Sequence, residues 1–144
     1  MNDLFKILLE STAGNSLNNL AMLVFRVLLA VELFRVHGLK KFKGNNGQPE
    51  EVPNPFHFPK AINQGIAAFA DTVAPMMVIL GLFTRLAILP TIGVTAVGYF
   101  WVHRNDPAER RDIPYMYTLC FLLLFIIGPG TYSLDNYLLS TLTK

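Results

Sequence analysis

The stretch LNNLAMLVFRVLLAVELFRVHGLKKFKG, residues 17–44, decides the fold class of this chain. Its first half carries a single charge, Arg26, whereas its second half contains an acid, an arginine, a histidine and three lysines. A helix that crosses the hydrocarbon core of a bilayer needs about 20 mostly apolar residues. The stretch therefore predicts a membrane-spanning helix over residues 18–39 that ends in a polar segment.

Three more apolar runs follow, each between polar loops. Residues 61–83 contain one charge, Asp71, and residues 86–103 begin after Arg85. Residues 113–127 begin between Asp112, which can cap a helix, and Pro114, which suits a first turn. We therefore predict an all-α integral membrane protein, a four-helix bundle that occupies residues 18–137.

The flanking segments are predicted to lie at the membrane surface or outside the bundle. Residues 1–17 read as an N-terminal amphipathic surface segment, and the run SLDNYLLSTL, residues 133–142, reads as a short interfacial helix that leads into a C-terminal tail, 138–144. The first loop, residues 40–60, contains four prolines and two glycines and is therefore not expected to be helical. In this loop, Phe56 and Phe58 are predicted to anchor to the interface or to plug the bundle end.

Composition supports the bilayer as the partner of this chain. Apolar residues make up 52% and charged residues 15%, against about a quarter charged in soluble domains. The net charge of +2 and the absence of a basic aromatic patch exclude nucleic acid as a partner class. The single cysteine, Cys120, excludes a disulfide framework and a thiolate metal site, and we predict no metal.

Lysines and arginines gather beside the first and third loops. This distribution favours a multi-pass protein of the plasma or inner membrane with both termini outside the cytoplasm.

Four charged residues fall inside the predicted spans, where each would cost about 2.5 to 3.5 kcal/mol at mid-bilayer. Two are positive and two negative, which predicts internal pairing. Glu32 and Arg35 are spaced i, i+3 and can pair locally, whereas Arg26 needs a partner elsewhere. We interpret these three as structural ion-pair residues. Asp71 lies near mid-depth, and we expect it to join Glu32 or Arg35 in one polar network.

The polar ends of the helices converge on the side of the first and third loops. We predict a ligand-binding cavity there that opens toward the lysines, with Tyr117 as a further neighbour. The predicted ligand-binding residues are His37, Asp71, Tyr99, His103 and Tyr115. A structural ion-pair network with an ordinary aromatic belt is the alternative interpretation. A bis-histidine haem on His37 and His103 is the weakest alternative, because each imidazole would need inward aim and second-shell support.

Several motifs in this order resemble the DoxX family of small four-helix membrane proteins. They are RVLLAVELFRVHGLKKF, ADTVAPMMVILGLFTRLA, a helix that ends in Val102-His103, and GPGTYSLD, and together they cover about residues 20–137. Relatives usually carry a glutamate where this chain has Asp71, and the first loop here is longer and richer in proline than the family pattern. The resemblance implies membrane topology and an association with quinone chemistry.

The function that we predict is a subunit of a quinone-linked membrane oxidoreductase system that binds a quinone or small amphiphile in the polar cavity. The chain has no cysteine pair and no dinucleotide glycine motif, so we expect no cofactor in the chain itself beyond a quinone, and a redox partner protein would supply electrons. Whether the chain is itself an enzyme stays open. The alternatives are a non-catalytic membrane assembly partner and a small-molecule carrier, the latter as a homodimer.

Overall fold

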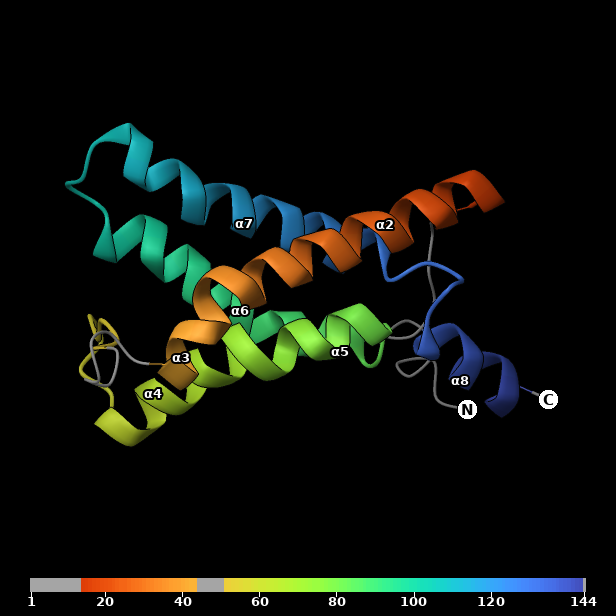
Figure 1. Cartoon of the computed structure of the whole chain (residues 1–144), viewed down its shortest axis with the longest axis horizontal. Helices are drawn as coiled ribbons and strands as arrows, with labels where there is room; N and C mark the ends of the chain where they lie inside the picture. Colours follow the sequence, from red (N-terminus) through yellow and green to blue (C-terminus); the bar gives the residue numbers. More distant parts are fainter. Residues whose placement is uncertain (1–13, 44–50, 144) are drawn as a thin grey trace.

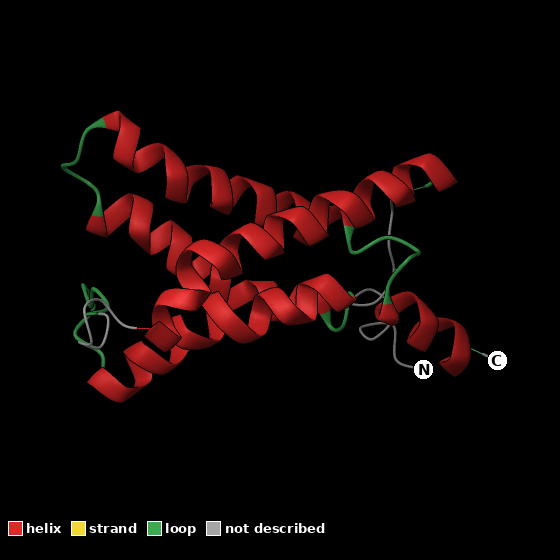
Figure 2. Ribbon diagram, in the orientation of Figure 1, coloured by secondary structure: helices red, strands yellow, loops and turns green. Residues whose placement is uncertain are grey.

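The computed structural model describes residues 14–43 and 51–143, and the described residues are helical with no strand (Figure 2). They form five continuous helices, three of which are built from several segments (Figure 1). The segments are α2 (Ser16–Leu33), η1 (Phe34–Gly38) and α3 (Leu39–Lys43) in the first helix; α4 (Lys60–Ala68), η2 (Phe69–Val73) and α5 (Ala74–Leu80) in the second; α6 (Thr84–Val97) and η3 (Gly98–Val102) in the third; then α7 (Ala108–Ile127) and α8 (Leu134–Leu142).

Three of these helices are long and apolar enough to cross a membrane: Ser16–Phe42, Lys60–Leu80 and Thr84–Val102. They confirm the first three predicted spans. The fourth predicted span lies in α7, which has sufficient length but carries Glu109, Arg110, Arg111 and Asp112 in its first turns. Its remaining residues, 113–127, are free of charge.

The structure corrects three boundaries that we predicted. Residues 40–43 are helical, because the prolines of the first loop come later in the chain and nothing before them stops the first helix. The fourth helix begins after Pro107, so Asp112 lies inside it and is not its cap. The predicted short C-terminal helix is present as α8, which continues past residue 138, where we began the tail. Most of the predicted surface segment 1–17 lies outside the described residues.

Each of the first three helices contains one π-helical turn of five residues, η1, η2 and η3. In η2 the Ala74 N–H donates to the carbonyl of Phe69, which leaves the carbonyl of Ala70 without its usual helical donor. The Thr91 hydroxyl, from α6, donates to that carbonyl at 3.0 Å. Pro75 adds to the distortion because it has no N–H. Such turns insert a residue into a helix and often occur at functional sites.

The surface of the bundle is apolar, as expected for helices in lipid. Among the described residues the main cluster of buried apolar side chains is small: Met22, Ala30, Leu33, Val78, Ile88, Phe121 and Leu124. Large apolar side chains instead point outward, among them Leu28, Leu122 and Ile126, with 64%, 40% and 67% of their surface exposed. Exposure on this scale would be costly in water and is favourable against hydrocarbon tails.

One end of the bundle is closed by a group of polar contacts that we call the C-terminal clamp, made by Arg26, Gly81 and Asp135. The fully buried Asp135 carboxylate accepts the backbone N–H groups of Phe83, at 2.6 Å, and Thr84, at 2.9 Å, and so caps α6. The Asp135 N–H donates to the Gly81 carbonyl at 2.8 Å. The Arg26 guanidinium, also buried, donates to the carbonyl of Tyr132.

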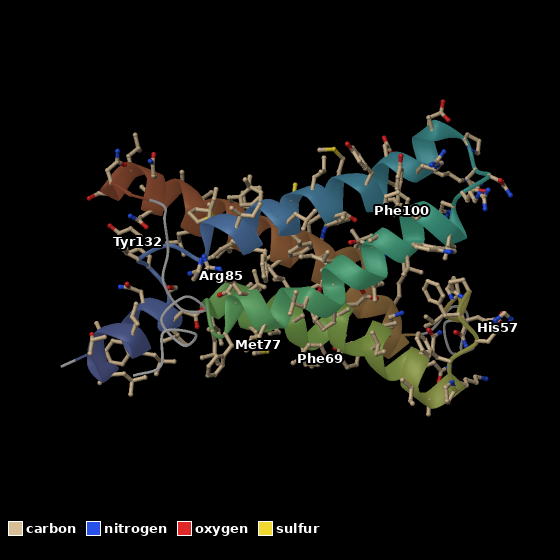
Figure 3. The ribbon with its side chains drawn as sticks, turned by 180° about the vertical axis from the view of Figure 1, so that it is seen from behind. His57, Phe69, Met77, Arg85, Phe100 and Tyr132 are labelled. Carbon is tan, nitrogen blue, oxygen red and sulfur yellow. The ribbon has the colours of Figure 1, made fainter. Side chains whose placement is uncertain are left out.

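Two further side chains hold the same end together. Arg85 donates to the carbonyls of Phe125 and Ile126 at 2.7 and 3.1 Å, where α7 ends. The Asn19 side-chain oxygen accepts the N–H of Thr131 at 2.8 Å. Figure 3 shows Arg85 and Tyr132 at this end, and His57 of the first loop at the other. The start of α2 and the last helix, α8, therefore lie at one end of the bundle, opposite the first loop (Figure 1).

Candidate functional site

A cavity of about 590 Å³ lies at the opposite end from the clamp, where the first loop approaches the helices. We call it the loop-side cavity. Its wall is mostly apolar and includes Phe56 and Phe58 of the loop with Pro90 and Val94 of α6. The ionisable side chains among its lining are His37, Lys41, Glu51, Asp71, His103, Arg110 and Tyr117. The cavity is thus an apolar space with a few polar groups, which is typical of small-molecule sites.

The first loop is held in place over this cavity by its own contacts. The Asn54 side chain accepts the N–H of Phe58 at 2.9 Å and donates to its carbonyl at 2.7 Å, which closes a compact turn. The Phe56 ring contacts Trp101 of η3 edge-on, with centroids 5.2 Å apart. These contacts join the loop to the third helix, and the loop phenylalanines line the bundle end as predicted.

The most enclosed charges of the cavity are a pair formed by Lys41 and Asp71. The Lys41 ammonium lies 3.4 Å from the Asp71 carboxylate, and the two side chains are 15% and 12% exposed. The pair forms because the two helices nearly touch at Gly38, where an added Cβ would lie 2.3 Å from the Asp71 carbonyl oxygen. Asp71 thus pairs with Lys41, whereas we expected Glu32 or Arg35.

Sequence reasoning missed Lys41 because it placed residue 40 and those after it in the first loop. A usable signal was present in the spacing, since Lys41 follows His37 by four residues and such residues share one face of a helix. Both side chains line the cavity. The His37 ring also contacts the Tyr117 ring edge-on, with centroids 5.9 Å apart.

Glu32 and Arg35 lie on the outside of the bundle. Arg35 donates to both carboxylate oxygens of Glu32 at 3.0 Å, and the side chains are 68% and 48% exposed for the arginine and the acid. Neither lines the cavity. Arg26, on the same helix, does not join this pair and lies in the C-terminal clamp, where the charge of Asp135 acts on it.

The five predicted ligand-binding residues divide into two groups. His37, Asp71 and His103 line the loop-side cavity. Tyr99 and Tyr115 do not line it, and their rings pack on each other with centroids 5.2 Å apart, with the Arg111 guanidinium 4.7 Å above Tyr99. A role in binding stays a prediction for all five. Within the described ranges 14–43 and 51–143, no three His, Cys, Asp or Glu side chains are placed to hold a metal ion.

Comparison with known proteins identifies the family. Residues 21–104 match DoxX, a region that runs from the first helix through His103. The chain belongs to the DoxX family. The predicted resemblance is thereby confirmed, and the match includes the three π-helical turns and the Lys41–Asp71 pair.

Two relatives of this DoxX-family protein are inner membrane proteins of Escherichia coli. The chain is 32% identical to inner membrane protein YqjF over 131 residues, which cover 85% of this chain and 95% of YqjF. It is 29% identical to inner membrane protein YphA over 127 residues, which cover 80% and 89%. An uncharacterized protein of Haemophilus influenzae is 29% identical over 127 residues, which cover 83% of both chains. No solved structure matches the chain.

The relatives and the apolar helices agree on where this DoxX-family protein resides. It is a multi-span protein of the inner membrane. The predicted localisation is confirmed.

Gly93 offers a way to fill the cavity without disturbing the helix. It lines the cavity, and a Cβ at this position would meet no atom within 4 Å. We expect Gly93→Leu to keep or raise the Tm, because glycine inside a helix costs about 0.5 to 1 kcal/mol relative to alanine, and to abolish ligand binding by occupying the space. Gly65→Leu is the matched control, since its Cβ is equally free but Gly65 does not line the cavity. Thermal melts of both variants, and titrations of both with a short-chain quinone, check this prediction. Equal quinone binding by Gly93→Leu and Gly65→Leu would contradict it.

Proposed function

We propose that this DoxX-family protein binds a small amphiphile of the quinone class in the loop-side cavity, as a subunit of a quinone-linked membrane oxidoreductase system. The observation that carries the proposal is the Lys41–Asp71 pair inside a mostly apolar cavity of about 590 Å³. A buried ion pair costs desolvation energy and is a poor source of stability, so its position in a cavity favours a role in binding.

The size and chemistry of the cavity suit such a ligand. Small-molecule sites usually enclose about 300 to 1,000 Å³ and combine apolar walls with a few polar groups that orient the ligand. The apolar side chains of α6 and the first loop would receive the ring and tail. The Lys41 ammonium would donate to a ring oxygen, and the Asp71 carboxylate would orient that ammonium.

Electrons in this proposal come from outside the chain. The sequence carries neither a cysteine pair nor a dinucleotide-binding motif, so a redox partner protein would reduce or oxidise the bound ring. The DoxX protein would supply the cavity, the orientation of the ring and the groups that exchange protons with it.

The same proposal includes four membrane crossings. The fourth is the charge-free part of α7, residues 113–127, and its charged first turns would lie at the interface together with the loop-side cavity. Four crossings place the start of α2 and α8 on one side, and positive-inside counting puts the loop side in the cytoplasm. In a Cys120→Ser background, Asn54→Cys and Asn105→Cys should label only from the cytoplasmic side and Tyr137→Cys only from the other. Labelling of Asn54→Cys and Asn105→Cys from opposite sides would contradict four crossings.

Binding should depend on the Lys41–Asp71 pair and not on its exposed neighbours. We expect Asp71→Asn and Lys41→Met each to weaken binding of a short-chain quinone by about tenfold or more, because a hydrogen bond to a charged group contributes about 1.5 to 3 kcal/mol. The measurement is quenching of the single tryptophan, Trp101, which contacts the cavity-lining Phe56.

The controls for this experiment lie beside the pair. Lys40→Met removes an exposed lysine next to Lys41, and Glu32→Gln removes an exposed acid of the same helix. Neither should change the Kd. Equal losses in Lys40→Met and Lys41→Met would contradict the proposed site, and the absence of saturable binding in the parent would favour the assembly-partner alternative.

A further inference from the structure

A histidine–carboxylate dyad lies at the wall of the loop-side cavity, just after the third helix. The His103 Nδ1 atom lies 2.7 Å from the Asp106 carboxylate, and the Asp106 N–H donates to the His103 carbonyl at 3.0 Å. His103 lines the cavity and Asp106 does not. Both side chains are about one-third exposed, at 38% and 33%. Asp106 was not among the residues that the sequence singled out.

The dyad fixes which nitrogen of His103 carries the hydrogen. An ionised carboxylate can only accept hydrogen bonds, so the hydrogen of the neutral ring lies on Nδ1. The other nitrogen, Nε2, then has a lone pair and accepts a hydrogen bond. Since Asp106 occupies Nδ1, Nε2 is the ring nitrogen of this cavity-lining histidine that is left for a ligand.

This acceptor differs from the other charged groups around it. Lys41 and Arg110 are donors only, and the Asp71 carboxylate faces the Lys41 ammonium at 3.4 Å. The remaining carboxylate of the lining, Glu51, is exposed to solvent. A ligand that presents a carbonyl oxygen can use the donors, but only a ligand that presents a hydroxyl can use Nε2. The dyad therefore favours a ligand with a hydroxyl group over one whose oxygen carries no hydrogen.

We propose that Asp106 is a positioning residue that sets His103 Nε2 as an acceptor, and that the site consequently selects a ring with a free hydroxyl, a phenol or quinol. This inference rests on the proposed function and narrows its ligand class from quinone-like amphiphiles in general to their hydroxyl-bearing form. No covalent or redox step is involved, because the selection operates on binding alone. A site built to bond a hydroxyl discriminates strongly against an analogue that lacks it.

The test compares 4-nonylphenol with 4-nonylanisole, two probes with the same ring and tail that differ by a methyl group on the oxygen. Each is titrated into the purified full chain in detergent while Trp101 fluorescence is followed. In the parent the phenol should bind about tenfold more tightly than the anisole, the gain of one hydrogen bond. The chain has three histidines, so ¹⁵N spectra of histidine-labelled protein also report the tautomer of each.

Four variants test whether Asp106 sets the tautomer of His103 or only packs against it. Asp106→Asn should reduce the phenol preference to about one, because its amide can donate to Nδ1 and move the ring hydrogen to Nε2. His103→Leu should do the same, and Asp106→Glu should retain the preference. Asp112→Asn, an exposed acid in the next helix, should behave like the parent. The ¹⁵N spectrum should show the His103 hydrogen on Nδ1 in the parent and on Nε2 in Asp106→Asn.

Each contrary result has a definite meaning. Saturable binding of both probes with a ratio near one in the parent would overturn the inference and leave the proposed function standing. An unchanged tenfold preference in Asp106→Asn would overturn the role of Asp106. If neither probe shows saturable binding, the inference and the proposed function both fail.

Discussion

Asp135→Ala is expected to destabilise the protein by about 3 to 5 kcal/mol, the largest effect that we anticipate for a single side chain. The substitution removes both acceptors of the Phe83 and Thr84 N–H groups and leaves the first turn of α6 uncapped. It also removes the carboxylate whose charge acts on Arg26, which is 1% exposed and would remain buried without it. A buried charge that loses a nearby compensating charge is far more costly than an exposed one.

A thermal melt in detergent measures this effect. A thiol-reactive dye that reports exposure of the single cysteine, Cys120, gives the Tm, which should fall by about 10 °C or more. Asp112→Ala is the control, because Asp112 is exposed on α7 and should melt like the parent. A parent-like Tm for Asp135→Ala would mean that the clamp does not hold the bundle end together.

Gly38→Ala is expected to lower stability by about 1 to 3 kcal/mol and to weaken ligand binding as well. Its Cβ would lie 2.3 Å from the Asp71 carbonyl oxygen and 2.7 Å from the Phe34 ring, so the two helices would have to separate. Because the first of these atoms is backbone, no side-chain rotation can relieve the contact. The separation would also draw Lys41 away from Asp71.

The matched variant for Gly38→Ala is Gly65→Ala, which adds the same methyl group where no atom lies within 4 Å. This control should gain about 0.5 to 1 kcal/mol from helix propensity. The comparison uses the same melt and the same quinone titration. If Gly38→Ala had the stability and the quinone Kd of the parent, the two helices could separate without loss of stability. The close crossing at Gly38 would then have no role in the site.

The fold was predictable where it depends on local sequence. Runs such as 18–39 and 61–83 carry so few charges that a helix in a bilayer is the only structure that satisfies their backbone groups. The Glu32–Arg35 pair also followed from local spacing, since i, i+3 residues meet on a helix whatever surrounds it. We placed the start of α7 at Asp112 because an acid is a favourable helix cap. In the structure the helix already begins after Pro107, so Asp112 lies inside it.

The candidate site was predictable only in part, because its geometry arises between helices. His37, Asp71 and His103 could be expected at one end of the bundle from the direction of each span. The Lys41–Asp71 pair depends on the close crossing at Gly38 and on the π-helical turns, which shift the register of every following residue. Tyr99 and Tyr115 were expected in the cavity, but their rings pack against each other at a tilt of 41°, with Arg111 over the Tyr99 ring. No pattern in a single segment specifies such contacts.

The clamp also bears on how the chain is made. The cap on the first turn of α6 comes from Asp135, which is synthesised 51 residues after Thr84. While the ribosome is still adding α7, the amide groups of Phe83 and Thr84 have no carboxylate to bind, and the Arg26 guanidinium has no Tyr132 carbonyl. The bundle end can therefore close only once translation has passed residue 135. A chain that stops before residue 135 has the three long apolar helices described above and lacks the Asp135 contacts that close this end of the bundle.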